Sequence, residues 1–202
     1  MFSYTIPVWV QSLFPSVTWK VKTTRPVVYL TFDDGPHPEI TPWVLEQLQT
    51  YNAKATFFCV GDNVHKFPQT YRQVLEAGHR TGNHTYHHLK GWKTPVDIYL
   101  EDIRLCSEKV DSDLFRPPYG KITPAQINQL KSRFQVVMWD IMTFDFDVSI
   151  IPAKALSIIL PRIRAGSVIV FHDSEKAERN MKVMLPQLLE FCKQKGYTFE
   201  TL

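Results

Sequence analysis

The stretch PVVYLTFDDGP, residues 26–36, decides the fold class, because it has the pattern of a buried strand followed by a sharp stop. Its run of apolar and β-branched residues is typical of a strand covered on both faces. Gly35-Pro36 must end the strand, since proline has no N–H to donate to a neighbouring strand. The adjacent carboxylates Asp33 and Asp34 therefore stand at the carboxyl end of the strand.

Similar short apolar runs alternate with longer segments of helical period through the rest of the chain. We expect further strands at 53–60, 79–82, the start of 114–120, 134–139, 167–171 and 197–200. We expect helices at 39–51, 62–77, 94–110, 123–132, 152–163 and 176–195, with Ile98, Leu100, Ile103 and Leu105 on the core face of the third. This alternation is typical of an α/β fold with a mainly parallel sheet.

The composition is that of one soluble globular domain. The 202 residues are 44% hydrophobic and 21% charged, which excludes disordered, collagen-like and disulfide-scaffold proteins. The formal charge of +3 is spread along the chain, so charge does not indicate nucleic acid as a partner. No run approaches the roughly 18–20 apolar residues of a membrane span. The three cysteines, Cys59, Cys106 and Cys192, form no C-x-x-C motif and are expected to be buried free thiols.

The N-terminal segment MFSYTIPVWVQSLFPSVTWK is apolar and aromatic, but Pro7 and Pro15 interrupt it. It lacks the basic start and the small-residue cleavage site of a secretory signal. We expect residues 1–24 to form a packing arm beside a main domain at 25–202, with contact to a membrane surface as the alternative. Without a signal peptide the cytoplasm is the expected location, and association with a membrane or the cell surface is the alternative.

Residues capable of chemistry follow the ends of the expected strands. They are Asp33 and Asp34, His84 and His88, Arg116 to Tyr119, Asp140 to Asp147, and His172. In parallel α/β folds these loops meet at the carboxyl edge of the sheet, so residues distant in sequence converge there. The clustering predicts an active site at that edge.

The acidic pair and the histidines together have the composition of a metal site. Taken alone, D-D-G-P is also typical of a turn, and H-T-Y-H-H is also typical of a solvated loop. His84 lies four residues from His88 and three from His87, and either spacing brings two imidazoles within reach of one ion. Two imidazoles and one carboxylate form a catalytic zinc set with a position left for water. With the second carboxylate as base, such a site implies hydrolysis of an acyl bond.

His172 follows the strand at 167–171 and is either a packed residue or a general acid, which needs a carboxylate to keep it charged. The candidates for that carboxylate are Asp145, Asp147 and Asp173. Arg116 is either a surface residue before two prolines or the partner of a catalytic carboxylate. Four aromatic residues are either core residues or the wall of a sugar-binding site: Tyr119, Trp139, Phe144 and Phe146.

These residues stand in the order of a known family's motifs. Over about residues 25–200 the sequence resembles the polysaccharide deacetylases of carbohydrate esterase family 4, which share the nodulation-factor deacetylase-like homology domain. Thr31-Phe32-Asp33-Asp34 matches T-F-D-D, and His84 to His88 matches H-[ST]-x-x-H. Arg116 to Tyr119 matches R-x-P-[YF], and Val170 to His172 matches L-x-H. Four separated matches in the right order leave chance a poor explanation.

The resemblance implies a role for each matching residue. Asp33 is the base and His172 the general acid, and the metal ligands are Asp34, His84 and His88. Arg116 orients Asp33, and Asp145 tunes His172. The backbone amide of Tyr119 helps the metal to stabilise the oxyanion. Tyr119, Trp139, Phe146 and Val170 are the substrate-binding residues, and Val170 lines the acetyl pocket.

The resemblance also implies a fold and an activity. The expected fold is a distorted, incomplete (β/α) barrel of about seven strands. The expected protein is a bacterial metal-dependent hydrolase that removes N-acetyl groups from chitin-like or peptidoglycan-like glycans containing N-acetylglucosamine. Zinc is the expected cofactor, with cobalt or nickel as alternatives, and no protein partner is indicated. The alternatives are an O-deacetylase of acetylated xylan or another small acylated substrate, and a sugar-binding or metal-binding protein without catalysis.

Two motifs depart from the family pattern. The fourth motif, D-x-x-D-W, is here Met142-Thr143-Phe144-Asp145-Phe146, so Met replaces its first Asp and Phe replaces its Trp. In the fifth, Val170 replaces Leu and leaves the pocket apolar. Because these changes fall on substrate-facing positions, we expect them to alter specificity more than the reaction.

Overall fold

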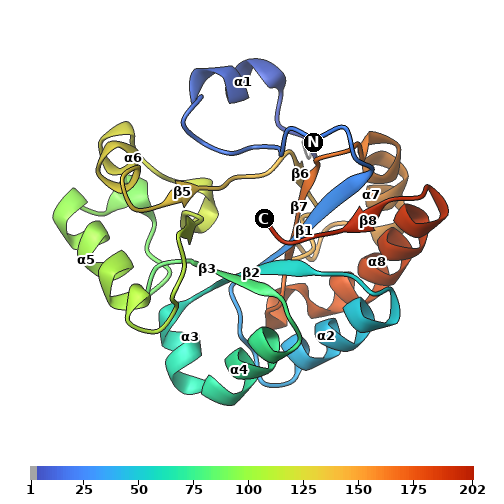
Figure 1. Cartoon of the computed structure of the whole chain (residues 1–202), viewed down its shortest axis with the longest axis horizontal. Coiled ribbons are helices and arrows are strands. Elements are labelled where there is room, and N and C mark those ends of the chain that lie inside the picture. Colours follow the sequence, from blue (N-terminus) through green and yellow to red (C-terminus); the bar gives the residue numbers. More distant parts are fainter. Residues whose placement is uncertain (1–3) are drawn as a thin grey trace.

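A computed structural model of the chain describes residues 4–202 as a curled parallel sheet surrounded by helices (Figure 1). Seven strands lie in the order β5-β4-β3-β2-β1-β7-β6, and β8 pairs with β1. The strands are β1 Val27–Asp33, β2 Ala55–Cys59, β3 Arg80–Asn83, β4 Leu114–Phe115, β5 Gln135–Val136, β6 Ile141–Met142, β7 Val168–His172 and β8 Thr198–Phe199. All of these pairings are parallel. The expected incomplete (β/α) barrel is confirmed.

The helices cover the outer face of this sheet, as Figure 1 shows for α2 to α5, α7 and α8. They are α1 Val8–Leu13, α2 Ile40–Thr50, α3 Gly61–Lys66, α4 Pro68–Glu76, α5 Val96–Ser107, α6 Pro124–Leu130, α7 Pro152–Ile159 and α8 Glu175–Gln194. The main hydrophobic core lies between sheet and helices, where Leu30 and Phe32 of β1 belong to the same cluster as Leu185 of α8. Burial of this apolar surface is the main favourable contribution to folding.

Strand β1 illustrates how the sequence positions the chemistry, because side chains along a strand alternate between the two faces of a sheet. Val28, Leu30 and Phe32 belong to the helix-facing core, whereas Val27 and Tyr29 belong to a separate cluster inside the curl of the sheet. Continuing this alternation places Thr31 and Asp33 on the inner face. The strand ends at Asp33, at the carboxyl edge.

The N-terminal segment lies across the opening between β5 and β6, the two edge strands of the sheet. Thr5 forms an antiparallel bridge with Ile141 of β6, and Thr18 forms a parallel bridge with Val137 beside β5. Tyr4 is buried in the main core, and α1 lies over the opening in Figure 1. The segment therefore covers the open side of the barrel. Residues 1–3 of the expected arm lie outside the described residues, and its boundary at residue 24 stays a prediction.

Some element boundaries differ from the expectations. The helix expected at 62–77 is two helices, α3 and α4. A proline disfavours the helical conformation at the residue before it, and Phe67, before Pro68, has φ −125° and ψ 56°. The strand expected at 134–139 is only the short β5, and the chain beyond it pairs with the N-terminal segment at Val137. Helix α1 and strand β6 were not expected, since each is too short to display a period.

The core face of α5 was predicted only in part, since Ile103 is buried as expected. Ile98, expected in the core, is 54% exposed, and Leu100 and Leu105 are only partly buried. The buried residues of the helix are Tyr99, Asp102, Ile103 and Cys106. This face has helical spacing, but a carboxylate occupies one of its positions, so the pattern of apolar residues identified only part of it.

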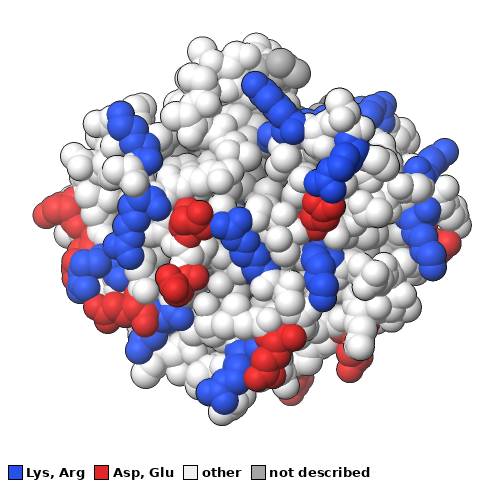
Figure 2. All heavy atoms as spheres, in the orientation of Figure 1, with Lys and Arg blue, Asp and Glu red and all other residues white. Residues whose placement is uncertain are grey.

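The surface and the cysteines complete the description. None of the helices in residues 4–202 is both long enough and apolar enough to cross a membrane. On the face seen in Figure 2, Lys and Arg side chains are interspersed with Asp and Glu. All three cysteines are buried free thiols, as expected.

Candidate active site

Asp33 and His172 stand side by side at the carboxyl edge of the two central strands. β1 and β7 pair in parallel with Asp33 in register with His172. Each lies two residues after an inner-face residue of its strand, so its side chain also points to the inner face. Both side chains are largely buried. Asp34 follows with a positive φ of 80° and begins the turn that leaves the strand. A carboxylate and an imidazole are thus held together by strand register, and a second carboxylate lies next to them.

Three residues at this edge direct ligand atoms towards one point. Asp34, His84 and His88 each offer one ligand atom, and these atoms all lie within 4.8 Å of one another. The Nε2 atoms of His84 and His88 lie 3.6 Å and 3.1 Å from Oδ1 of Asp34. Two ligands at about 2.1 Å from a tetrahedral zinc ion are about 3.4 Å apart, so the spacing fits such an ion.

Hydrogen bonds orient the first histidine of this set. Nδ1 of His84 lies 2.7 Å from the backbone carbonyl oxygen of Arg116, which can only accept a hydrogen bond. Nδ1 therefore carries a proton, and Nε2 faces the ligand cluster, where it would serve as the ligand atom for a bound metal. A metal-binding histidine commonly donates its other N–H to a carbonyl or carboxylate in this way.

The carboxylate of this set is held in its charged form. Burial opposes its ionisation, but hydrogen bonds from His84 and His88 outweigh burial and hold the pKa of Asp34 well below its usual range. The nearby charge of His172 acts in the same direction. A charged carboxylate between two imidazoles suits a divalent cation.

Arg116 positions Asp33 from beneath the sheet edge. Its side chain is fully buried, and its Nη1 donates to Oδ1 of Asp33 and to Oγ1 of Thr31, at 2.7 Å each. Nη2 donates to the carbonyl oxygen of Met138 at 2.8 Å, and the guanidinium lies 4.1 Å from the ring centroid of Phe58. These contacts fix the guanidinium on all sides, so the orientation of Asp33 is fixed as well.

His172 is paired with Asp145 rather than with Asp147 or Asp173. Nδ1 of His172 lies 2.8 Å from Oδ1 of Asp145, and the backbone N–H of His172 donates to Oδ2 of the same carboxylate at 2.8 Å. Burial lowers the pKa of His172, but the charge and hydrogen bond of Asp145, together with Asp34 and Asp33, outweigh burial and raise it to about 9. At neutral pH the imidazole therefore carries a proton that it can donate.

We expect Asp145→Asn to move the alkaline limb of the pH–rate profile to lower pH. Without the carboxylate the burial of His172 is less well opposed, so its pKa falls from about 9 and the protonated fraction at pH 8 decreases. At any pH above the new pKa, kcat/KM should fall about tenfold for each further increase of one in pH. Profiles of kcat/KM from about pH 6 to 10 test this, with Asp147→Asn as the matched control. An unchanged limb would contradict the role of Asp145.

The candidate substrate-binding residues occupy different environments. The rings of Tyr119 and Phe146 are exposed, and they lie 4.7 Å and 4.8 Å from the rings of His88 and His172. Trp139 is partly buried, packs in the inner cluster and leaves room only for Gly120 beside it. Val170 is fully buried in β7, and Met142 pairs with it. The structure thus brings Tyr119 and Phe146 to the site and places Trp139 and Val170 beneath it.

Asp102 of α5 was missed by the sequence analysis, although it holds the histidine loop in place. Its Oδ2 accepts hydrogen bonds from the backbone N–H groups of Tyr86 and His87, at 2.9 Å and 3.0 Å. Its Oδ1 lies 2.5 Å from Nδ1 of His87. His87 therefore bonds Asp102, whereas His88 lies in the ligand cluster with Asp34 and His84. The sequence alone does not show that Asp102 is buried, and its task is visible only in the structure.

Asp102→Asn is expected to weaken zinc binding about 10- to 100-fold, the usual cost of losing a group that orients metal ligands. The amide offers one oxygen and one NH2 group, so either the two backbone N–H groups or the His87 ring would face a donor in place of a carboxylate oxygen. Competition with a chromophoric chelator measures the affinity. Asp97→Asn, on the exposed side of the same helix, is the matched control. Equal affinities in the two variants would show that Asp102 does not position the loop.

Asp173 performs a similar task for the turn after β1. Its Oδ1 accepts from the backbone N–H of Gly35 at 3.1 Å, and Oγ1 of Thr41 donates to its Oδ2 at 2.5 Å. A Cβ on Gly35 would lie 2.1 Å from this carboxylate, so only glycine fits there. Burial and the charge of Asp34 raise the pKa of Asp173 to about 7, despite the opposing hydrogen bond from Thr41. Asp173 therefore stabilises the turn that carries Asp34.

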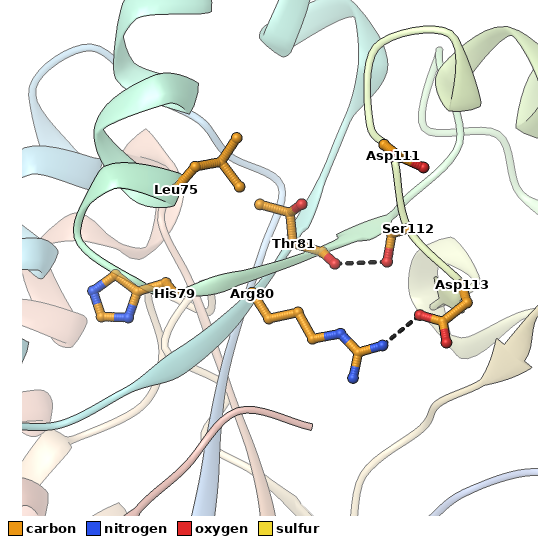
Figure 3. Close-up of a pocket in the computed structure, with 7 residues that line it drawn as sticks. All are labelled: Leu75, His79, Arg80, Thr81, Asp111, Ser112 and Asp113. Atoms are coloured by element: carbon orange, nitrogen blue, oxygen red, sulfur yellow. Dashed lines mark hydrogen bonds and ion pairs between the residues drawn. The ribbon is translucent and has the colours of Figure 1, made fainter.

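A separate hollow of about 370 Å³ lies beside the start of β3, at the opposite edge of the sheet (Figure 3). Arg80 and Asp113 form an ion pair across it, and Ser112 donates to the carbonyl oxygen of Thr81 at 2.7 Å. Burial, with the nearby charge of Lys54, lowers the pKa of His79 to about 4, so this lining histidine is neutral. The hollow lies apart from the candidate active site.

Comparisons with known proteins agree with this geometry. The family model for polysaccharide deacetylases matches residues 20–136, which include the first three motifs. A peptidoglycan-N-acetylglucosamine deacetylase of Bacillus cereus is 33% identical over 194 residues, covering 92% of this chain and 91% of its own. A chitooligosaccharide deacetylase of Azorhizobium caulinodans is 32% identical over 162 residues, covering 76% of this chain and 77% of its own.

A solved structure extends the likeness to the whole fold. It is a crystal structure of the Bc1960 peptidoglycan N-acetylglucosamine deacetylase with a bound N-hydroxybenzamide compound. The TM-score is 0.86 at 31% sequence identity, over 96% of this chain and 94% of that one. From the ordered motifs, the shared fold and the matching family model, we conclude that the chain belongs to the polysaccharide deacetylase family, the carbohydrate esterases of family 4.

Proposed function

We propose that the protein is a metal-dependent hydrolase that removes the acetyl group from N-acetylglucosamine units of a poly- or oligosaccharide. One observation carries this proposal: the cluster of Asp34, His84 and His88 lies at the same sheet edge as the Asp33 carboxylate and the protonated imidazole of His172. A metal ligand set flanked by a base and an acid provides the groups that hydrolysis of an amide requires. The deacetylases of Bacillus cereus and Azorhizobium caulinodans are the source of the proposed substrate class.

The residues of the chain divide the proton transfers between them. A divalent metal bound by the cluster supplies a Lewis acid that polarises a carbonyl oxygen and lowers the pKa of water. Asp33 would accept a proton from water as the oxygen of that water forms a bond to the acetyl carbon. His172 donates a proton to the sugar nitrogen as the carbon–nitrogen bond breaks. The products are acetate and a free amino sugar.

One backbone group of this chain would support the charge that develops on the acetyl oxygen, and a buried arginine would keep the base in position. In our proposal the backbone N–H of Tyr119, a residue held at a positive φ of 60°, donates to that oxygen. Preorganised donors of this kind usually contribute the largest part of catalysis in acyl transfer. Arg116 keeps Asp33 in place throughout, because its own contacts to carbonyl oxygens and to Phe58 are independent of substrate.

We propose zinc as the native metal, with cobalt or nickel as functional substitutes. Two imidazole nitrogens and one carboxylate are a common catalytic zinc set. Imidazole-rich sites also accept cobalt and nickel, so the donor set permits more than one transition metal. In our proposal residues 25–202 form the catalytic domain.

One experiment separates this function from its alternatives. Protein treated with a chelator is titrated with zinc, cobalt or nickel while acetate release is followed from N-acetylglucosamine oligomers and from acetylated xylan. Zinc-dependent acetate from the oligomers supports the proposal. Acetate from xylan alone would instead identify an O-deacetylase. If the oligomers bind to zinc-loaded protein but no acetate is released, the protein is a binding protein and the proposal fails.

A further inference from the structure

We propose that two loops beside His88 form a second sugar subsite, which holds an anionic sugar next to the acetamido sugar that loses its acetyl group. This inference rests on the proposed function and specifies the substrate class further. The subsite consists of Lys90 and Trp92 from one loop and Tyr119 and Lys121 from the other. Its expected ligand is a sugar carrying a carboxylate.

The two loops are held against each other by hydrogen bonds. Nε1 of Trp92 donates to the carbonyl oxygen of Ile122 at 2.9 Å. Nε2 of Gln126, a buried residue of α6, donates to the carbonyl oxygen of Gly91 at 3.0 Å. Gly91 itself lies so close to the second loop that a Cβ would be 2.3 Å from the carbonyl oxygen of Lys121. The loops therefore form one rigid surface rather than two independent segments.

The aromatic rings of this surface are exposed although their positions are fixed. Trp92 is 61% exposed and Tyr119 is 56% exposed. Each ring has a lysine ammonium beside it but is otherwise largely open to water, and exposed aromatic rings are a common feature of binding surfaces. A ring offers a flat apolar face with a polar rim, which matches the faces of a sugar ring. These two rings are the proposed platform for the sugar.

The two lysines contact aromatic rings but have no carboxylate partner among the described residues. The Lys90 ammonium lies 4.3 Å from the centroid of the Tyr119 ring, and the Lys121 ammonium lies 4.0 Å from that of Trp92. Within residues 4–202 neither ammonium forms an ion pair with a carboxylate. Both retain hydrogen-bond donors, since an ammonium has three. Two unpaired cations beside a sugar platform indicate an anionic ligand, whose contact with them is a charge-assisted hydrogen bond.

The subsite is continuous with the candidate active site. The Tyr119 ring lies 4.7 Å from the ring of the metal-ligand candidate His88. Lys90 and Trp92 follow His88 by two and four residues, so the same loop carries the ligand and the platform. A glycan with its acetamido group at the ligand cluster would place a neighbouring sugar on these rings.

The test compares three substrates. The first is an N-acetylglucosamine oligomer, which is neutral. The second is an oligomer of equal length in which N-acetylglucosamine alternates with N-acetylmuramic acid, which carries a carboxylate. The third is the second with its carboxylates converted to amides. We expect kcat/KM of the unaltered protein to be highest for the second substrate, and the preference to shrink at about 1 M salt, where charge interactions are screened.

Variants show which residues make the preference. Lys90→Gln with Lys121→Gln should lower kcat/KM on the carboxylate substrate about tenfold, while the neutral oligomer and the amidated substrate change less than about twofold. Lys109→Gln, in the exposed turn that follows α5, is the matched control and should change none of them. Trp92→Leu should lower kcat/KM on all three substrates, and Trp92→Phe should restore most of it, because the ring is retained.

The results separate this inference from the proposed function. If acetate is released from all three substrates at the same rate, or if the double lysine variant loses activity equally on all three, the anionic subsite is wrong while the deacetylase function stands. If no acetate is released from any substrate by the zinc-loaded protein, the proposed function fails and the subsite fails with it.

Discussion

Asp33→Asn is expected to lower kcat on an N-acetylglucosamine oligomer by about 10²- to 10⁴-fold, the range of a lost general base. The asparagine still accepts a hydrogen bond from Arg116 but cannot take a proton from water. The ligand cluster does not include Asp33, so the variant should retain zinc. Acetate release and the zinc content of the same preparation give the two readouts.

Stability requires its own control in this variant. Removal of one charge from the buried pair of Asp33 and Arg116 leaves the guanidinium unbalanced, and such changes cost about 3–5 kcal/mol of folding free energy. Thermal unfolding of the variant should therefore be measured first, so that activity is assayed at a temperature at which the variant is folded. Asp62→Asn, on the outer surface of α3, is the matched control and should keep full activity. Activity within about tenfold of the unaltered protein, with the fold intact, would remove Asp33 from its role as base.

His88→Ala should lose zinc on dialysis and lose kcat by about 10³-fold or more, because two ligands remain where a catalytic site uses three. His88 is only half-buried, so its removal leaves the core unchanged and the variant should fold. Zinc content, thermal unfolding and acetate release are measured together. Added zinc at high concentration should restore only a small part of the activity.

His87→Ala is the informative comparison for this variant. His87 is the neighbouring imidazole, and its ring bonds Asp102 instead of facing Asp34. The variant should retain zinc and lose no more than about tenfold in activity, since Asp102 still accepts the two backbone N–H groups of the loop. Loss of zinc from His87→Ala together with its retention in His88→Ala would reverse the assignment.

The sequence predicted the parts of the fold that depend on regular patterns. The apolar run before Asp33-Asp34 is long and fully buried, so its strand and its end were evident. The strand β6 has only two residues, and no period can be recognised over such a length. On α5 the apolar pattern placed Ile103 correctly but Ile98 wrongly, because Asp102, a charged residue, occupies part of the core face. Local patterns thus predict elements whose residues share one role, and they fail where a buried polar group has a specific task.

The candidate site followed the same rule. The chemical residue types after strand ends were predictable, because parallel strands bring their carboxyl ends together. Of the partners that orient them, Arg116 and Asp145 were predicted from the family motifs, whereas partners supplied by helices elsewhere in the chain were not. Asp102 comes from a helix, and Thr41, the partner of Asp173, from another. Spacing alone left His87 and His88 equivalent; the family motif favours His88, and the hydrogen bond of His87 to Asp102 agrees with that choice.

The N-terminal segment has a consequence for solubility. An edge strand without a partner exposes backbone donors and acceptors that promote association with other chains. Thr5 pairs with an edge strand of this sheet, and Thr18 pairs with the chain beside the other edge strand. Residues 4–18 therefore occupy both edges and oppose aggregation. The family model begins only at residue 20, so a fragment that started there and ran to residue 202 would lack this protection. Such a fragment would retain every candidate catalytic residue and still be prone to self-association.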